Sequence, residues 1–421
     1  MASPQSLAEW LAYIEHQHVR PIELGLDRVA QVRDWLGLHF SAPIITVGGT
    51  NGKGSTCAML ESILGCAGYR TGLYTSPHLL RYNERVRIAG VEVADEVLAN
   101  AFARVEAARG AVPLTYFEFG TLAALCIFAD AKLDAIILEV GLGGRLDAVN
   151  ICEPDCTVVT GIALDHMEFL GDTREKIGFE KAGIFRAGRP AICADPQAPQ
   201  SLLQHAAQIG ADLRLIGRDF GFSGDRQQWN WWGRTQRRSG LAYPALRGAN
   251  QLLNASGALA ALESIAERLP VTMQAVREGL LKLDLPGRFQ ILPGRPTVVL
   301  DVAHNPQAIG VLAENISNMA YAPETYAVIG MLGDKDIDAA VRLIEKRIDH
   351  WIAVGLAGPR GISGEDMARH LREIGVQGDI SVAETPRLGF AAARERAEDD
   401  DRIIIFGSFL TVADVLAVVH S

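Results

Sequence analysis

A glycine-rich turn near the start of the chain is the segment best suited to bind a phosphate. The sequence IITVGGTNGKGST at residues 44–56 joins an apolar strand to a helix. Glycines let backbone N–H groups approach phosphate oxygens, and the helix N-terminus and the Lys53 ammonium add positive charge. Ser55 or Thr56 could then face magnesium. Because Gly54 separates Lys53 from Ser55, the spacing departs from GxxxxGK[ST], and an ordinary turn is the alternative.

Other segments could supply magnesium ligands or line a substrate pocket. Glu139 is near the carboxyl end of an apolar strand, where a buried carboxylate without a partner is costly and a metal ion would remove the cost. Asp165 and His166 also follow an apolar strand, although a hydrogen-bonded core histidine is the alternative for His166. Lys181 falls in a charged helix that Gly183 is expected to end, and a solvated charged face is its usual explanation.

A parallel sheet would bring these residues together. Strand-like apolar runs alternate with helical periodicity almost throughout, which predicts βαβ units and the α/β class. Open α/β sheets bind ligands at the carboxyl ends of their strands, so the phosphate turn and the two acidic segments should share that edge. In the first half we expect strands at 43–49, 135–140 and 157–163, and helices at 52–67, 94–109 and 118–131.

The length of 421 residues predicts two domains. Proline and glycine cluster in LPGRFQILPGRP at residues 285–296, which places a boundary near residue 290. We expect a P-loop-type mononucleotide-binding domain with a mostly parallel sheet over residues 1–287, a linker over 288–296, and a Rossmann-like domain over 297–421. The second domain should contain strands at 297–303, 326–331, 350–354 and 402–407, and helices at 337–347 and 364–374.

One segment interrupts this pattern. Between residues 194 and 249 the periodicity loosens, and Trp229, Trp231 and Trp232 lie among Gly, Arg and Gln. The segment is interpreted as a small peripheral β-rich insertion. A platform for stacking nucleic-acid bases is the alternative, but the chain is acidic and lacks a basic groove.

The amino-acid composition of the chain argues against several classes of function. The chain is 48% hydrophobic and 21% charged, which is typical of a globular protein, and its apolar run near residues 122–129 is too short to span a bilayer. A formal net charge of −10 argues against nucleic acid as a partner. The first 20 residues do not resemble a secretory signal, so we expect a cytoplasmic protein. The six cysteines include no CxxC pair, which favours reduced thiols over a metal at Cys152 and Cys156.

Seven segments occur in order over nearly the whole chain. They are GTNGKGS (49–55), TSPHL (75–79), EVGLGGRLDA (139–148), LDH (164–166), EKAGIF (180–185), LPGRF (285–289) and DVAHNP (301–306). Together they resemble the folylpolyglutamate synthase family of Mur-type ATP-dependent amide ligases, and its bifunctional bacterial members in particular. The resemblance implies an enzyme that adds L-glutamate to dihydropteroate and to reduced folates.

The resemblance also implies a mechanism. The γ-phosphoryl group of ATP would pass to the carboxylate of the pterin substrate, and the amine of L-glutamate would attack the resulting acyl phosphate. The two domains would close over ATP and exclude water. The implied cofactor is Mg²⁺, with two ions and with K⁺ as a further candidate.

Matching motifs carry the family's functional residues onto this chain. For ATP they are Thr50, Asn51, Gly52, Lys53, Gly54, Ser55, Asn254, Arg288 and Asp301. Magnesium would be held by Ser76, Glu139 and His166, and Lys181 corresponds to a lysine that is carbamylated in the family. The catalytic set is then Lys53, Glu139, His166, Lys181 and His304.

The pterin substrate would bind to a second set of residues. They are Glu23, Leu24, Gly25, Leu26, Thr115, Tyr116, Phe117, Glu118, Leu146, Asp147 and Ala148. Phe117 offers an aromatic face for stacking, with core packing as the alternative for Tyr116 and Phe117. Residues 75–87, which include Arg81, Arg85 and Arg87, resemble the loop that shapes the folate site and gives it positive charge.

Three other functions stay open. They are a monofunctional folylpolyglutamate synthase, a Mur-type ligase for a cell-wall precursor, and a nucleotide-binding regulator. The TSPH and TYFE segments disfavour the cell-wall substrate, and the combination of Glu139, His166 and Lys181 disfavours the regulator. We expect a monomer whose partners are ATP, L-glutamate, dihydropteroate and reduced folates, with no nucleic acid and no membrane.

Overall fold

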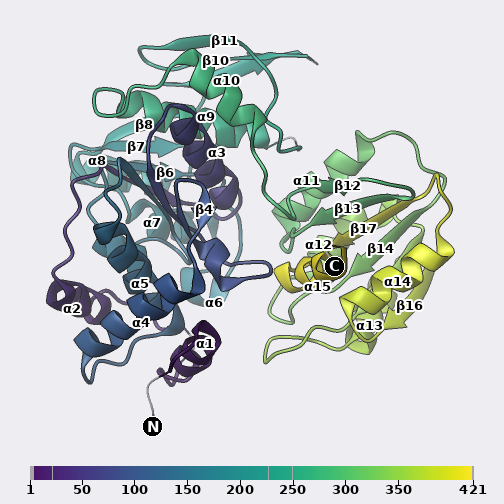
Figure 1. The fold of residues 1–421 in the computed structure, drawn as a ribbon. Helices are drawn as coiled ribbons and strands as arrows, with labels where there is room; N and C mark the ends of the chain where they lie inside the picture. The colour runs from purple at the N-terminus through teal and green to yellow at the C-terminus, as the bar shows by residue number, and fades with distance from the viewer. Residues whose placement is uncertain (1–3, 21, 226, 249, 420–421) are drawn as a thin grey trace. The chain divides into compact units, whose positions relative to one another are not determined.

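A computed structural model describes residues 4–20, 22–225, 227–248 and 250–419 of the protein (Figure 1). The chain divides into two units, the first formed by Met1–Ala245 with Leu252–Leu283 and the second by Leu246–Gln251 with Asp284–Ser421. Each unit has a mostly parallel sheet with helices packed on it, which confirms the predicted α/β class. No helix in the described part of the chain is both long and apolar enough to cross a membrane.

The first unit is built on an eight-stranded sheet in the order β4-β3-β2-β5-β1-β6-β7-β8. Strands β2, β5, β1, β6, β7 and β8 pair in parallel, while β3 and β4 form an antiparallel edge. The bounds are β1 Ile44–Gly48, β2 Thr71–Tyr74, β3 Val86–Ile88, β4 Val91–Glu92, β5 Ala135–Glu139, β6 Cys156–Val159, β7 Pro190–Cys193 and β8 Asp212–Leu215. Every residue of β1 and β5 is buried, as their unbroken apolar sequences predict.

Ten α-helices and two short 3₁₀ turns are described in this unit. They are α1 Leu7–Glu15, α2 Asp27–Leu36, α3 Lys53–Cys66, η1 Tyr82–Arg85, α4 Asp95–Arg109, α5 Tyr116–Asp130, η2 Ala148–Ile151, α6 Met167–Leu170, α7 Arg174–Ala182, α8 Gln200–Ile209, α9 Gln251–Ser264 and α10 Met273–Leu281. Helix α5 begins two residues before its predicted start because Thr115 and Glu118 form a capping box. Glu118 Oε2 accepts from Thr115 N–H at 2.8 Å, and Thr115 Oγ1 accepts from Glu118 N–H at 3.3 Å.

The predicted β-rich insertion differs from the structure in its first half. Helix α8 and strand β8 continue the main sheet, and only the later residues form a separate three-stranded antiparallel sheet, in the order β11-β10-β9. Its strands are β9 Gly221–Gly224, β10 Trp229–Trp232 and β11 Arg237–Leu241. Trp229 and Trp231 are 0% and 1% exposed, so they pack inside the fold and offer no stacking platform. The last residue of the predicted insertion, Ala249, is outside the described residues.

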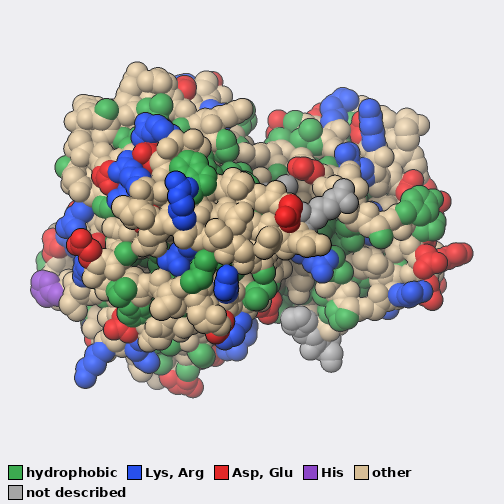
Figure 2. Space-filling model, turned by 90° about the horizontal axis from the view of Figure 1, so that it is seen from above, with side chains coloured by type: hydrophobic (Ala, Val, Ile, Leu, Met, Phe, Trp, Pro, Cys, Tyr) green, Lys and Arg blue, Asp and Glu red, His purple; other side chains and the backbone are tan. Residues whose placement is uncertain are grey.

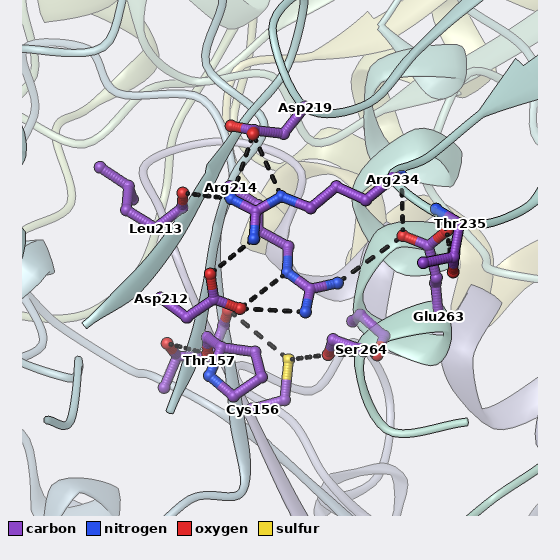
Figure 3. A network of polar contacts seen from close by, with 12 residues as sticks. Cys156, Thr157, Asp212, Leu213, Arg214, Asp219, Arg234, Thr235, Glu263 and Ser264 are labelled. Atoms are coloured by element: carbon purple, nitrogen blue, oxygen red, sulfur yellow. Dashed lines mark hydrogen bonds and ion pairs between the residues drawn. The ribbon is translucent and has the colours of Figure 1, made fainter. Parts of the chain in front are cut away.

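Glu263 fastens this small sheet to helix α9 (Figure 3). Its carboxylate accepts hydrogen bonds from the backbone N–H groups of Arg234, Thr235 and Gln236 at 3.2, 2.9 and 2.7 Å. The Arg234 guanidinium reaches back to Asp212, in β8, at 2.6 Å. The turn between β10 and β11 is therefore held by one buried carboxylate.

We expect Glu263→Ala to lower the free energy of unfolding by about 2–4 kcal/mol, because it removes the buried acceptor of three backbone N–H groups and the carboxylate that lies 3.6 Å from the Arg214 guanidinium. Urea unfolding followed by tryptophan fluorescence would measure this. The matched control is Glu267→Ala, since Glu267 is exposed, and its effect should be within about 0.5 kcal/mol. Equal effects of the two substitutions would contradict the anchoring role.

The second unit has a six-stranded sheet in the order β12-β13-β17-β14-β15-β16. Its strands are β12 Gln290–Leu292, β13 Thr297–Asp301, β14 Thr325–Ile329, β15 His350–Val354, β16 Asp379–Ala383 and β17 Arg402–Phe406. Its helices are α11 Pro306–Ser317, α12 Ile337–Ile344 with the turn η3 Glu345–Arg347, α13 Gly364–Ile374, α14 Pro386–Arg396 and α15 Phe409–Val419. All strands are parallel except β12, which lies in the segment expected to be a linker and pairs antiparallel with β13.

Candidate functional site

The phosphate turn is held against the segment that follows β6. Thr50 N–H donates to Gly161 O at 2.7 Å, and Ala163 N–H donates to Thr50 Oγ1 at 3.0 Å. These bonds explain why β6 ends at Val159 and not at the predicted residue 163, since the next residues bind the turn. Gly49 has φ = +146°, and a Cβ there would collide with the Thr160 side chain, so the turn requires glycine.

The ATP residues predicted in the first unit gather at the start of α3. Gly52 caps this helix with φ = +93°, and the side chain of Asn254, from α9, lies against it. The Lys53 Nζ donates to the carbonyls of Gly49 and Thr50 at 3.1 and 3.2 Å, so the ammonium folds back over the turn. The ATP residues predicted in this unit therefore lie together at the N-terminus of α3. They are Thr50, Asn51, Gly52, Lys53, Gly54, Ser55 and Asn254.

Two of the three predicted magnesium ligands are neighbours. Glu139 ends β5, is 4% exposed, and is paired in register with Val47 of β1, just before the phosphate turn. Its Oε2 accepts from the backbone N–H of Ser76 at 3.1 Å, because β2 and β5 are adjacent and Ser76 follows β2. His166 precedes α6 with φ = +50° and is partly exposed, which does not match the alternative of a core histidine.

The donor set suits a hard divalent ion. A carboxylate, a hydroxyl and an imidazole are ligands that Mg²⁺ or Mn²⁺ accepts, and a buried carboxylate such as Glu139 gains from a cation beside it. Within the described residues no group of three or more His, Cys, Asp or Glu side chains is placed to hold a metal ion. The hydroxyl of Ser76 and water or phosphate oxygens would have to complete the coordination.

Lys181 is buried, which rules out the solvated charged face as its explanation. It is 3% exposed on α7. The pKa of Lys181 is lowered to about 7, mainly by burial and also by the Lys53 cation, while the carboxylates of Asp165 and Asp147 oppose the shift. Lys181 therefore interacts electrostatically with Lys53 of the phosphate turn and with Asp165, which precedes His166.

The EVGLGGRLDA and EKAGIF segments fix the backbone around Lys181. Arg145 N–H donates to Glu180 O at 2.8 Å, and the Arg145 guanidinium donates to the Glu180 carboxylate at 2.8 Å. A Cβ on Gly144 would approach Glu180 O to 2.9 Å, and one on Gly183 would meet the Arg145 backbone. Arg145 and Glu180 were not predicted as site residues, although both lie in motifs that carried the resemblance.

The predicted pterin segments come together from three parts of the chain. Gly25 N–H donates to Leu146 O at 3.4 Å, which joins half-buried residues 23–26 to residues 146–148. Asp147 is 3% exposed and caps η2, and burial raises the pKa of its carboxyl to about 6. Arg28 joins Glu23 to Glu118, its Nη2 donating to Glu118 Oε1 at 3.0 Å. Nothing in the sequence indicates Arg28, because its partner is 90 positions away.

An aromatic group lines this region. The half-buried Phe117 ring rests on the backbone of Gly141 and lies 5.9 Å from the Tyr74 ring. Tyr116 is also half-buried, 5.9 Å from the ring of Tyr82. Both rings also pack against the hydrophobic core, so core packing and pterin stacking are compatible for this pair.

The predicted residues of the second unit form their own cluster. Asp301, at the end of β13, accepts from the N–H groups of Phe289 and Ala303 at 3.0 and 2.8 Å. Loss of solvent raises the pKa of Asp301 to about 6, and the Arg288 cation opposes the shift. The Arg288 guanidinium lies 4.9 Å from the ring centre of Phe409, and the His304 ring lies 6.1 Å from it. Phe409 was not predicted, and an apolar residue starting a helix carries no sequence signal for such a role.

Surface charge and the cysteine thiols are two further features of the structure. Basic and acidic side chains are interspersed over the face drawn in Figure 2, with neither sign segregated there. Cys152 and Cys156 are buried free thiols, and burial raises the pKa of each to about 12, which disfavours thiolate metal ligation.

Comparisons with known proteins identify the family of this chain. The Mur ligase middle domain matches residues 47–219, and the Mur ligase glutamate ligase domain matches residues 287–409. The fold, the phosphate turn and these matches define an ATP-dependent, amide-forming ligase of the Mur type. Over 421 residues the chain is 45% identical to the dihydrofolate synthase/folylpolyglutamate synthase of Escherichia coli (strain K12), covering 100% of this chain and 96% of that protein. The chain belongs to the dihydrofolate synthase/folylpolyglutamate synthase family.

Solved structures give the same result. E. coli FolC in complex with DHPP and ADP superposes with a TM-score of 0.94 at 43% identity, covering 99% of this chain and 98% of that one. A bifunctional folylpolyglutamate synthase/dihydrofolate synthase with Mn, AMPPNP and L-glutamate bound gives a TM-score of 0.92 at 46% identity, covering 100% of both chains. The resemblance inferred from the seven segments is confirmed, and the cell-wall and regulator alternatives are not supported.

Proposed function

We propose that this enzyme adds L-glutamate both to dihydropteroate, forming dihydrofolate, and to reduced folates, forming folylpolyglutamates. The observation that carries the proposal is the gathering of Lys53, Glu139 and Ser76 at one sheet edge, with buried Lys181 in the same electrostatic surroundings. An aromatic group suited to a pterin adjoins this edge. The bound DHPP, nucleotide and L-glutamate of the two relatives support the same substrates.

The chemistry requires activation of a carboxylate. Transfer of the γ-phosphoryl group of ATP to the acceptor carboxylate gives an acyl phosphate and ADP, and attack by the amine of L-glutamate forms the amide and releases phosphate. Lys53 and the N–H groups of the turn hold the phosphates and neutralise charge that develops during transfer. Residues 23–26 and 115–118 hold the acceptor in line, so the protein contributes alignment more than covalent chemistry.

Magnesium would supply further charge neutralisation at the phosphates when bound. We assign one ion to Ser76, Glu139 and His166, and a second to the carbamylated form of Lys181, with K⁺ as a further candidate cofactor. The manganese in the solved relative supports the use of a divalent ion. The pKa of Lys181 supports its carbamylation, because carbon dioxide adds to a neutral amine.

The two units would have different roles in the reaction. Residues 1–287 would bind ATP and the pterin, residues 288–296 would link the domains, and residues 297–421 would complete the glutamate ligase. Arg288, Asp301 and His304 would contact the nucleotide or the reacting groups. We expect a monomeric, cytoplasmic enzyme without nucleic-acid or membrane partners.

One assay tests the proposed function. Phosphate release with MgATP and L-glutamate would be measured with dihydropteroate, with tetrahydrofolate and without an acceptor, and the products identified by mass. Glutamyl products from both acceptors are expected. Product from tetrahydrofolate alone would leave a monofunctional folylpolyglutamate synthase, and product from neither acceptor would overturn the proposal.

Arg288→Met should lower kcat/KM by roughly 10²-fold, since it removes a cation proposed to contact the nucleotide. The thermal midpoint should change less than turnover, because Arg288 is only half-buried and a methionine side chain can still cover the Phe409 ring over which the guanidinium lies. Kinetics and thermal unfolding on the same preparation would separate the two effects. Arg295→Met is the control, as Arg295 is 72% exposed at its side chain. Parallel losses of turnover and stability in Arg288→Met would count against a nucleotide contact.

A further inference from the structure

Arg85 is a buried cation without an acidic partner among the described residues. It ends η1, in the loop of residues 75–87, and is 8% exposed. Its Nε donates to His78 Nδ1 at 2.8 Å, and its guanidinium carbon lies 5.1 and 5.6 Å from the ring centres of Tyr82 and Tyr116. Its Nη1 and Nη2 make no hydrogen bond or ion pair with any residue that the structure describes.

The other two arginines of this loop, unlike Arg85, have acidic partners. Arg81 pairs with Asp95 at 3.1 Å, and Arg87 pairs with Glu61 at 3.2 Å. Both are more exposed than Arg85, with side-chain exposures of 63% and 30%. The most buried cation of the loop is therefore the one without a carboxylate.

The carboxylates near Arg85 in sequence or through Tyr116 already accept hydrogen bonds from other groups. Glu118, close to Tyr116 in sequence, accepts from Arg28 and from the N–H of Thr115. Glu84, beside Arg85 in sequence, accepts from the backbone N–H groups of residues 79–81. Imidazole and aromatic faces carry no negative charge, so they offset only part of the cost of taking a guanidinium out of water. An anionic ligand would supply the missing charge.

The surroundings of Arg85 indicate which anion fits. Its carbonyl accepts from Thr75 N–H at 2.9 Å, next to Ser76 and the proposed metal site. On its other side it contacts Tyr116, which precedes Phe117, the proposed stacking residue for the pterin. A ligand with an aromatic ring system and a carboxylate would match both sides. A guanidinium can hold a carboxylate through two parallel hydrogen bonds.

We propose that Arg85 binds a carboxylate of the acceptor substrate through Nη1 and Nη2. This inference rests on the acceptors named under the proposed function. The carboxylate has two possible sources: dihydropteroate carries only the carboxylate that reacts, whereas a folate carries both a reacting carboxylate and the α-carboxylate of its glutamyl group. Binding the reacting group would make Arg85 important for both acceptors, and binding the α-carboxylate would make it important for folates alone.

The test compares ligands as well as variants. Dissociation constants without ATP would be measured for dihydropteroate, its carboxamide analogue, tetrahydrofolate and the analogue of tetrahydrofolate amidated at the α-carboxylate. The proteins are wild type, Arg85→Met, Arg85→Lys and the control Arg104→Met, which removes a 44% exposed arginine of α4 that pairs with Asp130. In Arg85→Met we expect the acid of one pair to bind roughly 10- to 100-fold more weakly while its matching amide binds nearly as before. If Arg85 binds the reacting carboxylate, that pair is the dihydropteroate pair, because the α-amide of tetrahydrofolate keeps its reacting carboxylate. Arg85→Lys should keep part of the preference, since it keeps the charge but loses the planar pair of donors.

Comparing the two ligand pairs shows which carboxylate Arg85 binds and which results would overturn the inference. Loss of preference in the dihydropteroate pair assigns the reacting carboxylate, and loss confined to the tetrahydrofolate pair assigns the α-carboxylate. Equal weakening of acid and amide in both pairs, with ADP binding and the thermal midpoint intact, would mean a damaged pocket and would overturn the inference. Unchanged binding in Arg85→Met would also overturn it. If wild type bound neither acceptor, the proposed acceptors would fail first, and this inference with them.

Discussion

Replacing Lys181 by alanine lowers kcat by roughly 10²- to 10³-fold, and millimolar acetate or formate restores part of it. This result is expected because Lys181 is 3% exposed and its cation is disfavoured both by burial and by the Lys53 cation. Carbamylation replaces that charge by an anion, which Lys53 and bound magnesium would attract. A small carboxylate that enters the space left by the side chain supplies the same charge. Steady-state phosphate release with and without the acid measures the rescue.

The control is on the same helix. Lys176→Ala removes an exposed lysine that pairs with Asp172 at 2.8 Å, and it should keep wild-type activity with no response to acetate. Lys181→Arg keeps the positive charge and cannot form a stable carbamate, so it should be inactive. A fully active Lys181→Arg enzyme would contradict carbamylation.

The pH dependence of carbamylation has a defined sign. Because the folded pKa of Lys181 is lowered from 10.5 to about 7, the neutral amine that reacts with carbon dioxide becomes abundant as the pH rises from about 6 to 8. The carbamate signal in ¹³C NMR with labelled bicarbonate should rise over this interval. The same lowered pKa makes the unfolded chain bind more protons between about 7 and 10.5, so for unmodified Lys181 this contribution to stability increases with pH there.

The sequence predicts the site best where a residue's place along a strand determines its position. Glu139 and the phosphate turn follow strands whose apolar runs are unbroken, and adjacent parallel strands place their ends at one edge. Local sequence patterns predict the structure less well where tertiary contacts determine whether a segment joins the sheet. Residues 160–163 look apolar enough for a strand but leave the sheet to bind Thr50 and Asn51. Strand β8 was missed because it is a half-buried edge strand with two charged residues in four.

Other features depend on partners far along the chain. Lys181 has the local sequence of an exposed charged helix, but it is 3% exposed in the fold, where Gly144 packs against the backbone of α7. Arg28 meets Glu118 across 90 positions. Arg85 looks like one of three equivalent loop arginines until the partners of Arg81 and Arg87 are known. Pairing of charges is a property of the folded chain, so composition and spacing do not predict it.

Glu139→Gln should lower kcat by roughly 10²- to 10³-fold while leaving the fold intact. The substitution keeps the size of the side chain, and its amide oxygen can still accept from the Ser76 N–H, which binds Oε2 at 3.1 Å. What it removes is one negative charge at a position 4% exposed, at the end of β5 beside the phosphate turn. A divalent ion gains much of its binding energy from such a carboxylate, so the affinity for Mn²⁺ should fall by roughly 10- to 100-fold.

Two measurements separate loss of metal from loss of structure in Glu139→Gln. Mn²⁺ binding in the presence of ADP, followed by electron paramagnetic resonance, should weaken, and raising the metal concentration should recover part of the activity. The thermal midpoint should change far less than the metal affinity, because glutamine keeps the size of the side chain and an oxygen that can accept from the Ser76 N–H. Glu92→Gln, on the exposed strand β4, is the control and should match wild type in both measurements. Wild-type Mn²⁺ affinity in Glu139→Gln would refute the assignment of Glu139 as a ligand, whatever its effect on turnover.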